Sequence, residues 1–148
     1  MPDPRAVRAF DPKIAAAFLK ANEKLTGLPA FLDVRFTGFE PGILRATLPV
    51  RDELLTPFKN LHGGVLSAVC DHVLGCVCYP HMRRGQWAAT TEFKLNLLAP
   101  VTNGEVTAEA EIVSLTRATA VVRIAVENEG RLVAIAQGTV LIRDPKPS

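Results

Sequence analysis

The sequence predicts an α+β fold in which a curved antiparallel β-sheet wraps around one long central α-helix, with an extra helix at the N-terminus. The first observation behind this prediction is a nearly all-apolar stretch at residues 65–79. The second is the order of the other patterns, with two β-type runs before that stretch and four after it. A helix that is apolar on most faces needs cover on nearly all sides, which a rolled sheet provides.

The composition indicates one domain with a full-sized core. The chain has 148 residues, of which 48% are hydrophobic, and its formal charge is +2. Lysine and arginine are scattered along it, so we expect no basic face that binds a phosphate backbone and no nucleic-acid partner. We expect a single domain over residues 1–148, with an N-terminal helical segment at 1–27 and a loose tail at 144–148.

The N-terminal helix is predicted from residues 12–25. Asp11 is placed to cap its start, Pro12 suits the first turn, and Gly27 marks its end. The apolar residues of this segment recur at helical spacing, and they are Ile14, Ala17, Phe18, Ala21 and Leu25.

Six β-type runs supply the sheet. Asp33–Phe39 and Ile43–Val50 predict a hairpin, because the proline and glycine of Glu40–Gly42 between them suit a tight reversal. The later runs are Ala88–Leu98, Gly104–Leu115, Ala118–Glu127 and Arg131–Ile142. An open sheet of six strands leaves two edges with unpaired backbone groups, so we expect a symmetric dimer that joins two sheets edge to edge.

The N-terminal region has no charged stretch followed by an uninterrupted apolar segment of signal-peptide type, which favours a cytoplasmic location. The apolar stretch at 65–79 is interrupted by Ser67, Asp71 and His72 and is too short to cross a hydrocarbon core of about 30 Å, so we expect no membrane contact. The three cysteines lie close together in this stretch. Their odd number argues against a disulfide framework and favours reduced core thiols.

The segment that indicates a site is His62-Gly63-Gly64, which opens the central helix, with Asp71 further along it. At helical spacing Gly64, Ser67 and Asp71 share one face. Each glycine weakens a helix by up to roughly 1 kcal/mol relative to alanine, which suggests that something must approach the backbone closely. An ionised aspartate in an apolar helix is costly unless it is hydrogen-bonded or reaches a wet cleft. Together these residues predict the wall of a site.

The same residues suggest a chemistry. The unpaired N–H groups at a helix start, here near Gly63 and Gly64, suit a carbonyl oxygen that gains negative charge. A carboxylate on that face, Asp71, suits the deprotonation of a water molecule or direct attack on the carbonyl carbon. A thioester, which has a good leaving group, fits so modest a catalyst.

At these residues the sequence resembles the phenylacetic-acid-pathway (PaaI-like) branch of the hot-dog thioesterase superfamily, whose pattern is H-G-G with an aspartate nine positions after the histidine. His62 and Asp71 match that pattern. The resemblance implies the hot-dog fold, hydrolysis of acyl-CoA thioesters to free coenzyme A and a carboxylic acid, and no metal or bound cofactor. It also implies a homodimer or a dimer of dimers with active sites at the dimer interface.

The resemblance implies further site residues on both sides of the helix. Relatives often place a serine or threonine on the strand after the helix, donated from the facing subunit to orient water, and Thr90 or Thr91 occupies that region. Relatives also commonly carry an asparagine six positions before the histidine. This chain has Thr56 there, and its nearest asparagine is Asn60.

Other residues have two interpretations each. Arg83, Arg84 and Arg117 suit the phosphates of coenzyme A in fork geometry, or are solvated loop charges. His62 either contacts substrate or is a structural residue of the helix entry. Cys76 lies four residues after His72, as two zinc ligands would, but the paired C-x-x-C spacing of structural zinc is absent and core residues are favoured.

Two other functions compete with thioester hydrolysis. One is a hot-dog hydratase or dehydratase that acts on acyl thioesters, which typically needs a different arrangement of histidine and acid at the helix. The other is a module that binds acyl-CoA or an acyl carrier without turnover.

Overall fold

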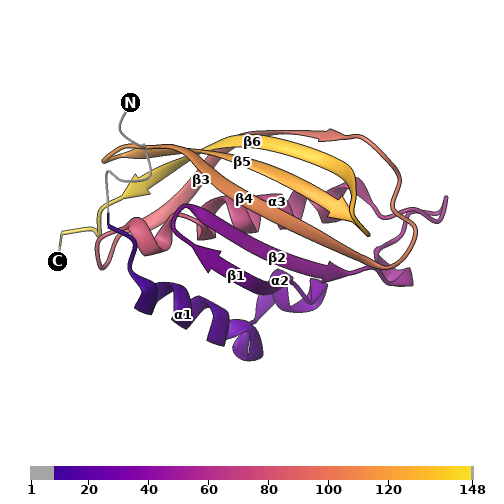
Figure 1. Ribbon diagram of the computed structural model, residues 1–148, viewed down its shortest axis with the longest axis horizontal. Helices are drawn as coiled ribbons and strands as arrows, with labels where there is room; N and C mark the ends of the chain where they lie inside the picture. Colours follow the sequence, from indigo (N-terminus) through magenta and orange to yellow (C-terminus); the bar gives the residue numbers. More distant parts are fainter. Residues whose placement is uncertain (1–8, 148) are drawn as a thin grey trace.

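The computed structural model describes residues 9–147, so residues 1–8 and 148, the ends of the expected N-terminal segment and tail, lie outside the described part. The predicted curved sheet, central helix and N-terminal helix are all present (Figure 1). In chain order the elements are α1 (Pro12–Lys20), η2 (Ala21–Lys24), α2 (Gly27–Leu32), β1 (Arg35–Glu40), β2 (Ile43–Pro49), η3 (Asp52–Leu54), α3 (Gly63–Cys76), η4 (Tyr79–His81), β3 (Trp87–Leu97), β4 (Glu105–Leu115), β5 (Thr119–Asn128) and β6 (Arg131–Arg143).

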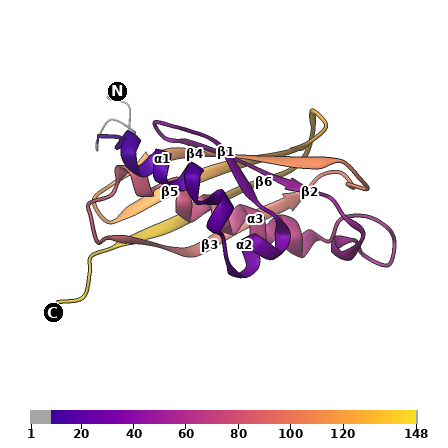
Figure 2. The ribbon, with the colours of Figure 1, turned by 90° about the horizontal axis from the view of Figure 1, so that it is seen from below.

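One antiparallel sheet in the order β1-β2-β4-β5-β6-β3 contains all six strands. It curves around α3, and α1 and α2 lie at its β1 end (Figures 1 and 2). The strands agree with the predicted runs to within a few residues, and Gly42 adopts a φ of 74° in the expected reversal between β1 and β2.

The core lies between α3 and the concave face of the sheet. One face of α3 is buried there through Leu66, Val69, Cys70, Val73 and Leu74. Buried and more exposed residues alternate along β2, β4 and β5, because successive side chains of a strand point to opposite faces. The stretch Gly63–His81 is long and apolar enough to cross a membrane by length and composition alone, but it supplies the core helix of this sheet.

The N-terminal segment differs from its prediction. Asp11 caps α1 as expected, since its carboxylate accepts a hydrogen bond from the Lys13 backbone N–H at 2.9 Å. The helix ends at Lys20, earlier than predicted, and a 3-10 turn follows. Gly27, with a φ of 67°, redirects the chain into the short helix α2, which was not predicted. The helical run has ended before Gly27, because Leu25 is extended, with φ −62° and ψ 146°.

The two edges of the sheet are unlike. At the β1 edge the side chain of Asn22 bonds Phe36, since its Nδ2 donates to the Phe36 carbonyl at 2.7 Å while the Phe36 N–H donates to its Oδ1 at 2.8 Å. The amide group thus pairs with this residue as a neighbouring strand would. At the other end, no strand within residues 9–147 pairs with the free edge of β3. An uncovered edge is a ready template for another chain.

Gly138 on β6 lies where the sheet packs closely against α3. A methyl group there would lie 2.5 Å from the Glu92 carbonyl oxygen and 2.8 Å from Leu74 Cδ1. The backbone oxygen lies beside the irregularity in the β3–β6 pairing and cannot rotate away. We expect Gly138→Ala to lower the free energy of unfolding by about 1–3 kcal/mol in urea titrations.

Gly38→Ala is the matched control, because the nearest atom to a methyl group at this β1 glycine is Arg45 Nη1, 3.6 Å away. That contact is ordinary, so we expect a change below about 1 kcal/mol. Equal effects of the two substitutions would contradict the assignment of the loss to overpacking.

The reactivity of the three cysteines reports how well α3 and the turn after it are shielded from solvent. All are free thiols, and Cys70 and Cys78 are buried. Desolvation by burial raises the pKa of Cys70, Cys76 and Cys78 to about 12. Because the thiolate is the nucleophile, we expect the native protein to resist iodoacetamide at pH 8 and the urea-unfolded chain to be alkylated at all three positions. Rapid alkylation of the native protein, followed by mass spectrometry, would show that this part of the core opens.

Candidate active site

His62 fixes the start of α3. It is the N-cap residue, and its ring Nδ1 accepts a hydrogen bond from the Gly64 N–H at 2.8 Å. The Val65 N–H donates to the His62 carbonyl at 2.9 Å. Of the two interpretations of His62, the structure has the helix-entry arrangement, with the ring bonded to an N–H group.

This cap separates the two glycines that were both candidate donors. The Gly64 N–H is already engaged by the His62 ring. The Gly63 N–H makes no hydrogen bond among residues 9–147, and it lies at the positive end of the α3 dipole. A methyl group at Gly63 would lie 2.8 Å from Leu97 Cδ1, so β3 packs closely against this residue. Gly63 is therefore the available donor at the helix start.

A short turn before α3 orients Asn60. The Thr56 N–H donates to the Asn60 carbonyl at 2.7 Å, and the Thr56 hydroxyl donates to Asn60 Oδ1 at 2.9 Å. The carboxamide oxygen is thus held, while its Nδ2 has no partner within the described chain. Asn60, Gly63 and Leu97 line one depression of about 260 Å³. The residue that stands where relatives have asparagine, Thr56, positions Asn60 here.

Asp71 lies on the face of α3 that points away from the core and is exposed. Its neighbours in a depression of about 240 Å³ include Leu28 and Leu32 of α2, and His72. Exposure explains how an ionised carboxylate is tolerated in so apolar a helix. Ser67, half-buried, lies between the helix start and Asp71 on the sequence-predicted small-residue face.

The rise of the helix separates Asp71 from the Gly63 N–H. The two residues are eight positions apart, which corresponds to about 12 Å along an α-helix. Hydrogen bonds span about 3 Å between heavy atoms, so no single carbonyl group reaches both from one chain.

The irregularity in β3 distinguishes the two candidate threonines. Thr90 pairs with the fully buried Val140, so its side chain is on the concave face with α3. The pairing is interrupted between Thr90 and Glu92, and the Thr91 hydroxyl donates to the Thr139 carbonyl at 3.1 Å. Thr90 is the one on the helix side of the sheet.

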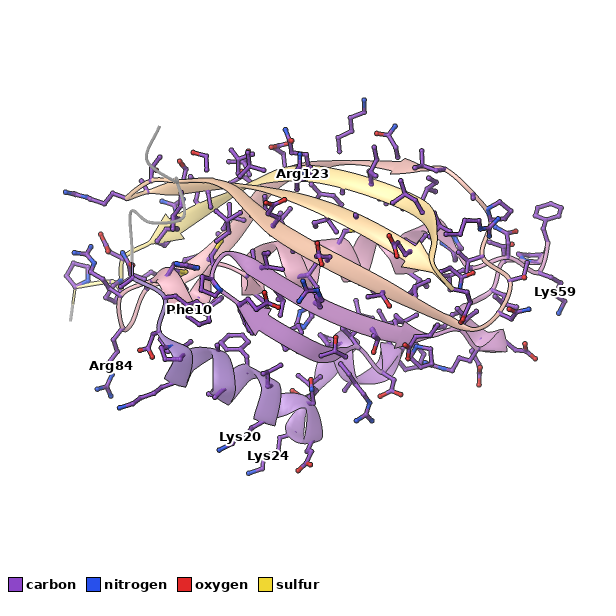
Figure 3. All side chains as sticks on the ribbon, viewed as in Figure 1. Phe10, Lys20, Lys24, Lys59, Arg84 and Arg123 are labelled. Atoms are coloured by element: carbon purple, nitrogen blue, oxygen red, sulfur yellow. The ribbon has the colours of Figure 1, made fainter. Side chains whose placement is uncertain are left out.

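The three candidate phosphate-binding arginines lie at the other end of α3. Arg83 and Arg84 follow η4, and Figure 3 shows Arg84 and Lys59 at opposite ends of the molecule. The Arg83 guanidinium lies 3.2 Å from Asp144, at the start of the expected tail. Arg117 occupies the turn between β4 and β5 and is exposed. Within one chain the structure does not bring these arginines to the start of α3.

His72 packs in the wall between α3 and β1. Its ring stacks on Phe36 with centroids 5.3 Å apart, and burial lowers its pKa. Its Nδ1 lies 4.0 Å from Cys76 Sγ, and its buried Nε2 has no hydrogen-bond partner in the described chain. Among residues 9–147, no group of three or more His, Cys, Asp or Glu is placed to hold a metal ion.

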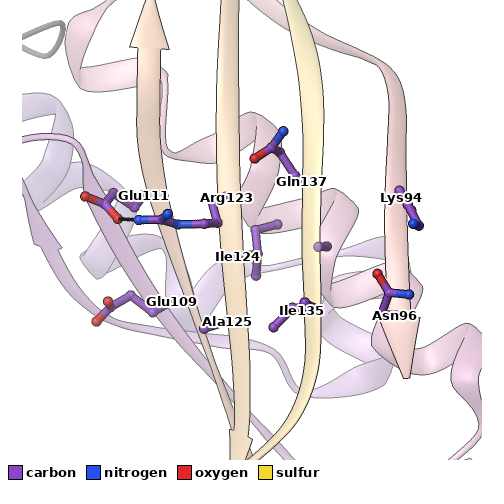
Figure 4. Close-up of a pocket in the computed structure, with 10 residues that line it drawn as sticks. Lys94, Asn96, Glu109, Glu111, Arg123, Ile124, Ala125, Ile135 and Gln137 are labelled. Atoms are coloured by element: carbon purple, nitrogen blue, oxygen red, sulfur yellow. Dashed lines mark hydrogen bonds and ion pairs between the residues drawn. The ribbon is translucent and has the colours of Figure 1, made fainter. Parts of the chain in front are cut away.

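A further depression, of about 220 Å³, lies on the convex face of the sheet (Figure 4). Lys94, Glu109 and Arg123 line it, and the Arg123 guanidinium bonds Glu111 at 2.9 Å. The sheet separates it from α3, and it contains none of the predicted site residues.

Sequence reasoning missed α2 and the depression beside it. Leu28, Phe31 and Leu32 of α2 line a depression of about 330 Å³ that also contains His62 and Gly64. The spacing of these three apolar residues, with Pro29 in the first turn, was the available signal. It was obscured by Gly27, which indicated a helix end.

The chain matches known protein families over its central part. Residues 58–135, more than half of it, match the model described as the thioesterase superfamily. The proofreading thioesterase EntH of Klebsiella pneumoniae is 29% identical over 109 residues, 74% of this chain and 79% of that protein. A 1,4-dihydroxy-2-naphthoyl-CoA hydrolase of Listeria monocytogenes is 26% identical over 118 residues, 79% of this chain and 96% of that one.

Solved structures share this sheet and helix. A thioesterase from Haemophilus influenzae matches with a TM-score of 0.83 at 25% identity, over 87% of this chain and 92% of that one. PaaI of the E. coli phenylacetic acid degradation operon matches in fold, with a TM-score of 0.80 at 20% identity over 90% and 96% of the two chains. The chain therefore belongs to the thioesterase superfamily and is a thioester hydrolase with the hot-dog fold, in keeping with its resemblance to the PaaI-like branch.

Proposed function

We propose that this enzyme hydrolyses acyl-CoA thioesters, with the Gly63 N–H holding the thioester carbonyl oxygen and Asp71 driving the attack. The observation that carries the proposal is the Gly63 N–H at the start of α3, which has no partner within residues 9–147 and lies beside a Gly64 N–H that His62 occupies. A preorganised donor at a helix start stabilises an oxyanion without reorganisation. The Listeria relative, named as a CoA-thioester hydrolase, supports coenzyme A as the thiol part.

The distance along α3 supports a site shared between two chains. About 12 Å separates Gly63 from Asp71 on one helix, so Gly63 of one chain acts with Asp71 of a second. Gly63 lies against Leu97, and Ala88 is the nearest neighbour of Gly75, so the middle of α3 lies beside the middle of β3. A two-fold axis at that point sets the two α3 helices antiparallel and joins both halves of each site.

The unlike edges of the sheet support the same dimer. Asn22 occupies the backbone groups of Phe36 at the β1 edge, while no strand of the described chain pairs with the outer edge of β3, where the Ala88 N–H donates to the Tyr79 hydroxyl at 3.4 Å. Trp87 and Leu97, at the two ends of β3, are 50% and 57% exposed. Antiparallel pairing of two β3 strands about their midpoint brings Trp87 of each chain next to Leu97 of the other. A dimer of dimers remains compatible with this pairing.

Other residues complete the proposed site. The Asn60 amide, oriented by Thr56, supplies a second donor beside Gly63, and Ser67 lines the small-residue face. The Thr90 hydroxyl, on the α3 side of β3, orients the attacking water. Antiparallel helices bring the partner's Arg83 and Arg84 toward the start of α3, where the phosphates of coenzyme A would need them, and Arg117 lies at that same end of the chain.

The proposed reaction uses water and the thioester only. Asp71 takes a proton from water and the hydroxide attacks the carbonyl carbon, or the carboxylate attacks directly and water then cleaves the anhydride. The oxyanion of the tetrahedral intermediate accepts a hydrogen bond from the Gly63 N–H. The C–S bond then breaks, and the thiolate takes up a proton. No metal or bound cofactor takes part. Three free thiols are in keeping with a cytoplasmic location.

Asp71→Asn tests the carboxylate. The side chain is exposed and makes no hydrogen bond within residues 9–147, so the variant should fold and dimerise as the wild type does. We expect turnover of an acyl-CoA panel, read as thiol release, to fall by roughly 10²–10⁴-fold, because the amide neither accepts a proton nor attacks. Turnover within twofold of the wild type would remove Asp71 from the mechanism.

Gly63→Pro tests the donor, because proline at the first helical position suits a helix but has no N–H. Gly63→Ala is its control, since it places the same Cβ against Leu97 and keeps the N–H. We expect a loss of about 10²–10³-fold for proline and a much smaller loss for alanine. Equal losses would indicate crowding at Leu97 and would argue against an oxyanion donor.

Mixed dimers of the Gly63→Pro and Asp71→Asn chains separate a shared site from a single-chain site. Each mixed dimer then holds one intact and one doubly defective site. Two inactive proteins refolded together in equal amounts should therefore regain roughly a quarter of the wild-type activity. No recovery, with mixed dimers demonstrated by mass spectrometry, would place both groups of a site in one chain.

A further inference from the structure

The side of α2 that faces away from the core carries exposed apolar side chains next to the start of α3. Leu28 is 57% exposed and Phe31 is 62% exposed, whereas Leu32 on the inner side of the same helix is 4% exposed. α2 lies alongside α3 (Figure 2). Exposed apolar side chains that gather at a depression mark a binding surface better than isolated ones do.

The depression between α2 and α3, here called the α2 trough, has an apolar lining. Besides Leu28, Phe31 and Leu32 of α2, it includes Leu54, Leu55, Val65 and Ala68. The side chains of Glu53 and His62, both exposed, are the polar ones in its described lining. Its volume is about 330 Å³, and Gly64 lies in its wall. The trough therefore begins at the helix start that carries the Gly63 N–H.

Arg51 holds Phe31 in place. Its guanidinium donates a hydrogen bond to the Phe31 carbonyl and lies 5.1 Å from the centroid of the Phe31 ring. The same guanidinium is 3.8 Å from the Glu53 carboxylate. A cation over an aromatic face contributes about 0.5–1 kcal/mol at an exposed site. Phe31 is thus a fixed wall of the trough although its ring faces solvent.

Two depressions flank the start of α3, and a thioester has two parts that need binding sites, the acyl group and the thiol. The depression with Asn60 and Gly63 offers a carboxamide and suits the thiol arm of coenzyme A, which carries amide groups. The α2 trough offers hydrocarbon walls without a cation among its described lining residues. A hydrocarbon chain gains about 25 cal/mol per Å² of apolar surface that it buries there.

We propose that the α2 trough binds the hydrocarbon part of the acyl group and that Phe31, positioned by Arg51, limits its length. The inference rests on the proposed function, since it takes the thioester carbonyl to lie at Gly63. Phe31 then determines specificity for chain length, and Arg51 is a positioning residue that acts through Phe31. The substrate class is an uncharged aliphatic or aromatic acyl group.

The test measures binding and turnover separately. Binding of non-hydrolysable thioether analogues with C4, C8 and C12 chains is followed by calorimetry for wild type, Phe31→Ala, Arg51→Met and Phe58→Ala. We expect Phe31→Ala to raise the C12:C4 affinity ratio by roughly tenfold, because the wall that excludes the longer chain is removed. Arg51→Met should shift the ratio in the same direction by roughly two- to fivefold. The C12:C4 ratio of kcat/KM, measured with the hydrolysable thioesters, should change in the same direction as the affinity ratio.

Phe58→Ala is the matched control, because Phe58 is 90% exposed on the turn before α3 and does not line the trough. It should leave the chain-length profile unchanged. An identical profile for Phe31→Ala and wild type would overturn the proposal, and so would dissociation of the dimer by Phe31→Ala on size exclusion, which would make this face a subunit contact. Thiol release reports on the proposed function alone: absence of release with the expected shift in binding leaves the trough assignment standing.

Discussion

Five side chains of α3 are buried against the concave sheet, so the helix cannot turn about its own axis. That fixed rotation directs the opposite stripe, with Gly64, Ser67 and Asp71, away from the core. Gly64 and Ser67 in this stripe are small, so they leave the backbone of this face accessible. The same packing sets the level of the helix start, where Gly63 meets Leu97 of β3. Burial of one face therefore determines what the other face presents.

The rigidity of α3 also fixes the distance between Gly63 and Asp71 within one chain. The separation of Gly63 and Asp71 follows from helical rise, and no side-chain rotation brings an N–H of the first turn and a carboxylate about 12 Å away to one carbonyl. The sheet offers the complementary constraint, because Asn22 occupies part of the β1 edge whereas no strand of the described chain pairs with the outer edge of β3. Both constraints favour the same two-fold arrangement, although one concerns catalysis and the other the hydrogen bonding of strands. In the proposed dimer, association of the chains and assembly of the site are a single event.

The sequence predicted the strands from apolar β-type runs bounded by turn residues, and the central helix from one long stretch that is nearly all apolar. It missed α2, a six-residue helix that begins at a left-handed Gly27. Within the site, the motif from His62 to Asp71 was evident from spacing. The choice of Gly63 over Gly64 was not, since it depends on the rotamer of one histidine ring. The two threonines were likewise inseparable, because an interruption in strand pairing reverses which residue faces α3.

The parts of the site differ in where they fall along the chain. Gly63, Asp71 and Thr90, the proposed donor, carboxylate and strand threonine, lie within residues 58–135, which match the thioesterase superfamily. Phe31, which lines the α2 trough, and Arg51, which contacts Phe31, lie before that segment. The chemistry of thioester hydrolysis constrains the first group closely, because carbonyl and water must meet within hydrogen-bond distance. An apolar wall is constrained only by volume, so under our proposal a change in α2 alters the acyl group that is accepted and leaves the reaction unchanged.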